Sequence, residues 1–219
     1  MFRPYTLEEG TYLVKAARSA VGHYLRYKKI VMPENPPQRT LQDSYGVFTT
    51  IEVPAGSRYE LRGCIGYPEG HVNTLYATIH SAIGACCQDP RFPALRLEEL
   101  PHVVFEVSIL SPLQLLEEKP RRYPEIVQIG RHGLVIKRGP YAGLLLPQVA
   151  IEECWNPVEF LIHTCIKAWL PGDCWLDPRT RVYIYETQIF RERQPEGEVY
   201  ERDLATERCS QETQKENGR

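Results

Sequence analysis

The segment from Leu61 to Tyr67 carries the residues best suited to chemistry. It reads Leu-Arg-Gly-Cys-Ile-Gly-Tyr, so the thiol of Cys64 lies between two glycines and follows the cation Arg62. Glycines at such positions, Gly63 and Gly66, indicate positive φ or a close approach of another backbone segment. A cysteine held in such a turn, with a guanidinium nearby, has surroundings that favour the thiolate. Cys64 is therefore a candidate nucleophile or redox thiol.

Two other interpretations of Cys64 remain open at this point. It can form the wall of a ligand cleft, or it can be a small buried residue chosen for its volume between two glycines. The neighbouring Arg62 supports a functional role, because an arginine is costly to bury for packing alone.

Two further ionisable residues are candidate acid–base groups. Glu106 lies in the middle of an apolar run, so if it points inward it must be paired or have a raised pKa. It would instead face solvent if Phe105 and Val107 take the opposite, buried face of a strand. His132 lies in a Gly-Arg-His-Gly segment, a turn-like setting in which an exposed imidazole could face a cleft. The alternative for His132 is a hydrogen-bonded surface or core histidine.

The segment Asp89-Pro90-Arg91-Phe92-Pro93 offers a carboxylate, a guanidinium and an aromatic ring. Asp89 could accept hydrogen bonds from Arg62 or Arg91, and Arg91 could clamp an anionic ligand through two parallel bonds. The alternative is a rigid loop at a helix end that is closed by an internal pair between Asp89 and Arg91.

The composition argues against several classes of protein. The histidine and cysteine spacings match no zinc pattern, and neither nucleotide-binding glycine motif is present, so we expect no metal and no cofactor. A formal net charge of −2 argues against a surface that binds nucleic acid strongly. Arg26, Lys28, Lys29 and the cluster 121–123 could still touch phosphates, so nucleic-acid binding is possible but not favoured.

The sequence predicts a cytoplasmic protein without a membrane segment. Met1 to Pro4 leads directly into a capped helix, with no apolar leader, and no apolar run approaches the roughly 20 residues that span a bilayer. The cysteine count is seven, and no two cysteines form a Cys-x-x-Cys pair. This pattern is typical of mostly buried, unpaired thiols in a reducing compartment, although a thermophilic source would tolerate internal disulfides.

Hydrophobic periodicity predicts interspersed helices and strands. Helices are expected to begin at Thr6, Asn73 and Asn156, each of which can cap the first turn. Strands are expected at 45–53, 59–65, 103–110, 127–137, 141–146 and 181–190, with a turn at 54–57 and with the Cys64 turn after the second strand. From Arg191 onward the chain is charged, so a solvated helix or a disordered segment is expected. Because the strands come in hairpins, an α+β fold with antiparallel sheets is favoured.

The six residues from Leu61 to Gly66 resemble the signature of the AMMECR domain family, which is named after a candidate gene in a human syndrome with Alport features, midface hypoplasia and elliptocytosis. Further stretches agree with the family, in its order, across roughly residues 5 to 192: 89–93, 106–110, 143–150 and 160–169.

The resemblance implies a two-lobed α+β fold, with an antiparallel sheet flanked by helices and a smaller lobe. Residues 1–192 would form the AMMECR domain, with a cleft near residues 61–67, and residues 193–219 a polar tail. The site residues that carry over from the family are Arg62, Gly63, Cys64, Gly66, Asp89, Arg91, Phe92 and Glu106. The resemblance also favours an inward or cleft-facing position for the Glu106 side chain.

The family has no established activity, so the resemblance leaves the function open. Its prokaryotic members are sometimes fused to or associated with a Memo-like protein and a radical S-adenosylmethionine protein, which makes these the expected kinds of partner. The first hypothesis is a binding or accessory protein that uses a cleft around Cys64. The second is a cysteine-dependent enzyme, related to RNA or nucleosides, in which Cys64, Glu106 and His132 act. The third is a nucleic-acid-binding regulatory protein.

Overall fold

The computed structural model describes residues 1–56 and 58–207 and divides the chain into two compact units. Of these residues, the large unit comprises 2–112 and 188–202, and the small unit comprises residue 1, residues 113–187 and residues 203–207. Each unit has its own hydrophobic core. The α+β fold with antiparallel strands is therefore confirmed.

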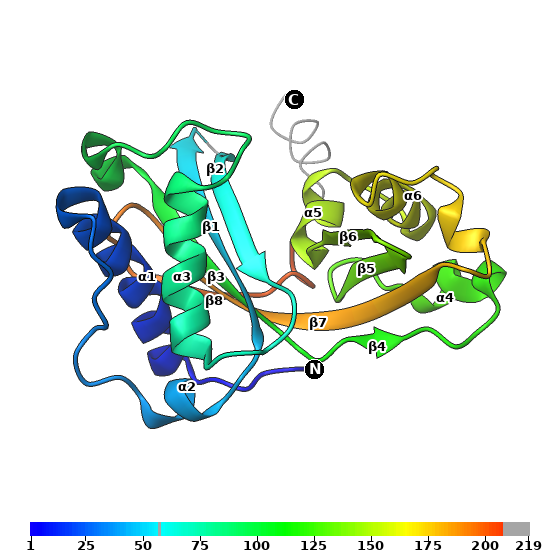
Figure 1. Cartoon of the computed structure of the whole chain (residues 1–219), viewed down its shortest axis with the longest axis horizontal. Helices are drawn as coiled ribbons and strands as arrows, with labels where there is room; N and C mark the ends of the chain where they lie inside the picture. Colours follow the sequence, from blue (N-terminus) through cyan, green and yellow to red (C-terminus); the bar gives the residue numbers. More distant parts are fainter. Residues whose placement is uncertain (57, 208–219) are drawn as a thin grey trace. The chain divides into compact units, whose positions relative to one another are not determined.

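Two helices of the large unit lie side by side over one face of its sheet (Figure 1). Helix α1 (Leu7–Tyr27) begins with the predicted capping box, in which Thr6 and Glu9 satisfy each other's backbone N–H groups. Helix α3 (Thr74–Cys87) is capped by Asn73, which accepts from the N–H of Tyr76. Shorter helices complete this unit: α2 (Gln38–Gln42) and the 3₁₀ turn η1 (Leu97–His102).

The sheet of the large unit has the strand order β2-β1-β3-β7. Its strands are β1 (Gly46–Ala55), β2 (Arg58–Tyr67), β3 (Val104–Leu110), the last part of β7 (Arg181–Glu192), and β8 (Val199–Arg202), which also pairs with β7. Side chains alternate between the two faces, and Ile51, Phe105 and Val107 pack in the core with α1 and α3. The opposite face carries the polar residues considered below.

The small unit is built on the hairpin of β5 (His132–Arg138) and β6 (Tyr141–Leu145), beside the first part of β7. Helix α6 (Pro157–Lys167) covers this hairpin (Figure 1) and is capped by Asn156 and Glu159. The other elements of the unit are β4 (Gln114–Leu115), η2 (Pro120–Arg122), α4 (Tyr123–Ile126), α5 (Pro147–Glu152) and η3 (Cys174–Leu176).

Three predictions about local structure are wrong. Cys64 lies inside strand β2 and not in a turn after it. The chain beyond Arg191 does not leave the fold at once: β7 continues to Glu192, and β8 adds a strand in which Val199 and Arg202 are buried. Residues 208–219 lie outside the described part of the chain.

The third correction concerns the cysteines. Cys165 and Cys174 form a buried disulfide between α6 and η3, and Cys154 is also disulfide-bonded. Among the described residues Cys64, Cys86 and Cys87 are free. No helix within the described ranges is long and apolar enough to cross a membrane. The domain boundary at residue 192 and the cleft near residues 61–67 stay predictions.

The Cys165–Cys174 disulfide should be a structural link of the small unit. The double variant Cys165→Ala/Cys174→Ala is expected to lose about 2–3 kcal/mol of unfolding free energy, because the unfolded chain is no longer constrained by the closed loop. Thermal melts with and without a reductant would test this. The reductant should lower the Tm of the double variant less than it lowers the Tm of the wild type. In the control variant Cys87→Ala, the reductant should lower the Tm as much as in the wild type. An equal fall in the wild type, the double variant and the control would contradict a structural role.

Candidate functional site

Three side chains from neighbouring strands form a row on the sheet face that α1 and α3 do not cover. Thr50 of β1 pairs with Cys64 of β2 on one side and with Glu106 of β3 on the other. Directly opposed residues of antiparallel strands point to the same face. The sheet register therefore brings together two residues that were predicted separately, Cys64 and Glu106, through a residue that was not predicted.

The thiol of Cys64 is half-buried and accepts a hydrogen bond from Thr50 Oγ1 at 3.3 Å. Burial raises the pKa of Cys64 to about 11, and the nearby carboxylates of Glu106 and Asp89 add to this, while Thr50 and Arg91 act in the opposite direction. The thiol is therefore neutral at pH 7. The prediction that this segment favours a thiolate is wrong, because desolvation outweighs the nearby cation.

Arg62 does not act on the thiol. Its Nε lies 3.0 Å from Glu99 Oε1, and its Nη1 donates to the carbonyl of Pro93 at 2.9 Å. Arg62 is the extra, unpaired residue of a β-bulge opposite Ile51 and Glu52, and its side chain is directed to the segment that follows α3. Arg62 thus ties β2 to residues 93–99 and has a structural contact in place of the predicted activating one.

Asp89 and Arg91 form a clip on the backbone of Cys64. The N–H of Cys64 donates to Asp89 Oδ2 at 2.8 Å, and Arg91 Nη2 donates to the Cys64 carbonyl at 3.4 Å and to Asp89 Oδ2 at 2.7 Å. Because β2 stands at the end of the strand order, its outer backbone groups have no strand partner in this sheet, and the clip satisfies them. The structure thus contains the rigid loop with an internal Asp–Arg pair; Arg91 also lies over the ring of Phe92 at 5.5 Å.

The clip also explains the ionisation of Asp89. Burial raises the pKa of Asp89, but the Arg91 guanidinium and the N–H groups of Cys64 and Arg91 outweigh burial and hold it at about 2. The carboxylate is therefore ionised throughout the neutral range.

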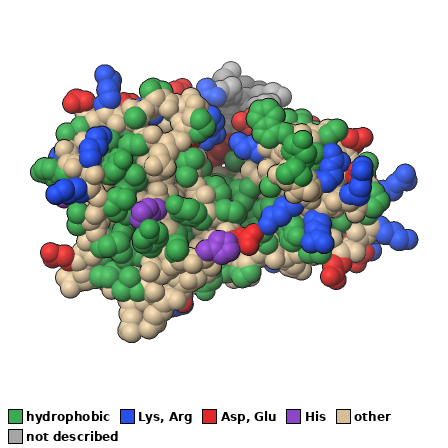
Figure 2. Space-filling view, viewed as in Figure 1, with side chains coloured by type: hydrophobic (Ala, Val, Ile, Leu, Met, Phe, Trp, Pro, Cys, Tyr) green, Lys and Arg blue, Asp and Glu red, His purple; other side chains and the backbone are tan. Residues whose placement is uncertain are grey.

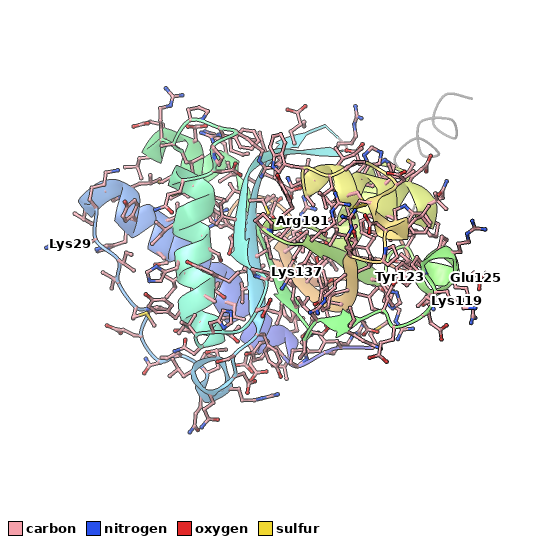
Figure 3. All side chains as sticks on the ribbon, turned by 45° about the vertical axis from the view of Figure 1, so that its right-hand side comes forward. Lys29, Lys119, Tyr123, Glu125, Lys137 and Arg191 are labelled. Atoms are coloured by element: carbon pink, nitrogen blue, oxygen red, sulfur yellow. A yellow bond between two sulfur atoms is a disulfide. The ribbon has the colours of Figure 1, made fainter. Side chains whose placement is uncertain are left out.

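Glu106 is inward-facing and paired, with 2% of its surface exposed. Its Oε2 lies 2.8 Å from Arg202 Nη1 and 3.7 Å from Arg191 Nη1. Arg191, labelled in Figure 3, also lies 2.6 Å from Glu52 Oε2 and stacks against Tyr59, 3.6 Å from the ring centre. Two carboxylates and two guanidiniums thus form a buried, charge-balanced floor beside Cys64, and each charge is compensated.

Sequence reasoning missed most of this floor. Glu52 and Thr50 share a strand face with each other by simple alternation, a signal that was available. Arg191 and Arg202 gave no such signal, because they lie in a charged segment whose strand character appears only when β8 pairs with β7.

The half-exposed side chains on this sheet face form what we call the Cys64 face: Phe48, Tyr59, Leu61 and Cys64. Gly66 lies under the ring of Phe48, and a Cβ at Gly66 would overlap with that ring. The Cys64 face therefore combines apolar and aromatic groups with one neutral thiol, beside the paired charges on the same side of the sheet.

His132 is the second of the two predicted acid–base residues. It belongs to the small unit, is buried, and accepts a hydrogen bond at Nδ1 from the N–H of Gln128 at 3.2 Å. Burial lowers the pKa of His132, and the charge of Arg131 lowers it further, so the imidazole is neutral at pH 7. The expectation of an exposed imidazole is therefore wrong.

The basic cluster at 121–123 has little capacity to bind phosphates. Arg122 pairs with Glu118 and Glu125, and Tyr123 is buried with its hydroxyl donating to the carbonyl of Leu116. Figure 3 shows Lys119, Tyr123 and Glu125 close together around α4. Acidic neighbours thus neutralise this surface, and the aromatic ring is not available for stacking.

Comparison with known proteins gives a consistent family. The sequence model of the AMMECR1 family matches residues 14–190. The chain belongs to the AMMECR1 family. It is 72% identical to a protein of Pyrobaculum islandicum over 219 residues, which cover 99% of each chain. It is 48% identical to protein MK0488 of Methanopyrus kandleri over 204 residues, which cover 92% of this chain and 97% of that one.

A solved structure extends the comparison to the fold. The crystal structure of the uncharacterised protein PH0010 from Pyrococcus horikoshii is similar with a TM-score of 0.86 and 41% sequence identity, covering 90% of this chain and 97% of that one. The AMMECR1 fold is therefore shared, and none of these relatives' names states an activity.

Gly63 should be required for close packing and not for an unusual backbone angle. Among the described glycines only Gly56, Gly130 and Gly139 have positive φ, and a Cβ at Gly63 would overlap with the carbonyl oxygen of Ala85 in α3. Gly63→Ala should therefore cost about 1–3 kcal/mol of unfolding free energy, and Gly63→Val more. In urea unfolding, Gly56→Asn in the same hairpin is the control, because its site is open and asparagine accepts positive φ. Equal stability of Gly63→Ala and the control would refute the packing argument.

The clip should make stability depend on pH in the acid range. The pKa of Asp89 in the folded protein, about 2, lies below its unfolded value, so the carboxylate stabilises the fold above about pH 4, and this is lost as pH falls toward 2. Asp89→Asn should therefore lose up to about 2 kcal/mol at pH 7, and its deficit should shrink between pH 4 and 2. Urea unfolding across this range, with the exposed Glu60→Gln on β2 as control, tests the pair; a deficit that is constant with pH would mean the clip is not ionic.

Proposed function

We propose that this AMMECR1-family chain is a binding or accessory protein, and that the Cys64 face recognises a small ligand, a peptide or a modified nucleoside without converting it. The observation that carries the proposal is the neutral thiol of Cys64, whose pKa is raised to about 11. At pH 7 the thiol is therefore protonated, whereas nucleophilic catalysis by cysteine uses the thiolate.

The surroundings of the thiol support the same proposal. A catalytic carboxylate must be free to exchange a proton, whereas Glu106 is buried against Arg191 and Arg202. Asp89 and Arg91 are committed to each other and to the backbone of Cys64. These groups hold the strand and its thiol in a fixed position, which suits recognition by shape and apolar contact.

The Cys64 face suits a ligand with an apolar or planar part. Phe48, Tyr59 and Leu61 offer ring and methyl surface, and Cys64 offers a weak hydrogen-bond donor. A family-associated Memo-like or radical S-adenosylmethionine protein would then deliver or receive what is bound. We place this function in the cytoplasm, since free thiols such as those of Cys64, Cys86 and Cys87 are typical of a reducing compartment, and internal disulfides also occur in intracellular proteins of hyperthermophiles.

Thiol reactivity separates binding from cysteine catalysis. Alkylation of the native protein, followed site by site by peptide mass spectrometry, should be slow for Cys64 at pH 7, and its rate should rise about tenfold for each pH unit toward pH 11. Cys87, a half-buried free thiol on α3, is the internal control. A Cys64 that reacts fastest of all and reaches a plateau with an apparent pKa below about 7.5 would establish the enzymatic alternative.

Ligand binding itself can be tested with a fragment library of small acids, amides and nucleosides screened by ¹H–¹⁵N NMR. We expect shifts at the amides of Phe48, Leu61 and Cys64, abolished in Leu61→Asp and retained in Leu41→Asp, an exposed leucine on α2. Shifts elsewhere only, or none, would count against the Cys64 face.

A further inference from the structure

The outward side of α6 carries an apolar stripe that the fold of the small unit does not use. Phe160, Leu161 and Cys165 fill the core, while Val158 and Ile166 are exposed on the other side of the helix, Ile166 by 54%. The partly buried Ile162 stands midway between Val158 and Ile166, one helical turn from each. Figure 2 shows hydrophobic side chains gathered where α6 lies in Figure 1.

Trp169 extends this stripe beyond the end of the helix. It is 88% exposed, and its φ of 59° is in the left-handed region, where glycine or asparagine would fit with less strain. The N–H of Trp169 bonds to the carbonyl of Ile166 at 2.9 Å, which fixes this conformation. A solvent-exposed indole on a residue with an unfavourable backbone φ is typical of an interface anchor, because tryptophan contributes most to the binding free energy where it is buried against a partner.

The stripe has the same spacing of apolar residues on both sides of Ile162, so it can pack against an antiparallel copy of itself. Val158 and Ile166 each lie four residues from Ile162, and Trp155 and Trp169 each lie seven residues from it. A twofold axis through Ile162 therefore places Ile162 on its copy and Val158 on Ile166, and it brings Trp169 toward the start of the partner's helix, next to which Trp155 lies. Trp155 offers Trp169 a flat surface, because it is stacked on His163 with ring centres 4.0 Å apart and planes 3° apart.

The charges on this side of α6 favour the same antiparallel arrangement. Glu159 lies near the start of the helix and Lys167 at its end, and both are exposed. In the antiparallel pair each glutamate comes near the lysine of the other copy, whereas a parallel pair would bring like charges together.

We propose that a second copy of this chain docks on α6, antiparallel and twofold symmetric, with Trp169 as the anchor. One helix face and one exposed tryptophan from each copy make a contact smaller than the standard interface of about 800 Å² per partner. The dimer is therefore weak, with a dissociation constant on the order of micromolar. This proposal is independent of the Cys64 face.

Engineered cysteines test the arrangement directly. In the full-length protein under mild oxidation, Ile162→Cys should give a covalent dimer, and a mixture of Val158→Cys and Ile166→Cys chains should cross-link more than either variant alone. Leu41→Cys, exposed on α2, is the control. Cross-linking of Val158→Cys with itself as strongly as in the mixture would overturn the proposed register.

Sedimentation equilibrium tests whether the dimer forms without cross-links. The wild type should show a monomer–dimer equilibrium, and Ile166→Asp and Trp169→Ser should each weaken it at least tenfold, while Leu41→Asp should not. The proposal would be overturned if the wild type stayed monomeric at a protein concentration of about 100 times the expected dissociation constant. It would also be overturned if neither Ile166→Asp nor Trp169→Ser weakened the dimer, which would leave α6 to a different partner.

Discussion

The large unit depends on how closely the end of α3 approaches strand β2. At Gly63 there is no room for a side chain against the carbonyl of Ala85, so helix and strand meet backbone to backbone. This approach brings the chain that leaves α3 to the outer edge of β2, where Asp89 accepts the N–H of Cys64 and Arg91 reaches its carbonyl. The glycine and the Asp–Arg pair, distant in sequence, are thus two parts of one constraint that fixes the position of Cys64.

The same constraint decides the chemistry of the thiol. Arg91 lowers the pKa of the Cys64 thiol, but the carboxylate of Asp89, to which the same guanidinium is bound, raises it. Burial then dominates and leaves the thiol neutral. Glu106 is likewise paired, with Arg191 and Arg202. A carboxylate that the sequence suggests as an acid–base group is thus charge-compensated in the structure.

The sequence predicted most elements because their signals are local. The caps at Thr6, Asn73 and Asn156 and the alternation of β1 and β3 involve residues within a few positions of one another. The features that the sequence could not predict depend on residues that are far apart along the chain. The strand character of β8 requires β7, and the direction of Arg62 depends on a bulge against β1. The row of Cys64, Thr50 and Glu106 depends on a register that one residue of slip would destroy.

The two proposals concern different units and follow from one principle: a feature that costs stability without serving the fold indicates a role outside it. On the large unit, aromatic and apolar groups stay half-exposed beside buried, paired charges. On the small unit, a tryptophan is held in solvent in a left-handed conformation at the end of a helix whose core-facing side is already filled. Folding alone would select a smaller residue at position 169 and polar residues along the outer side of α6. On the Cys64 face the charged groups are paired with one another, which supports the proposed role in recognition.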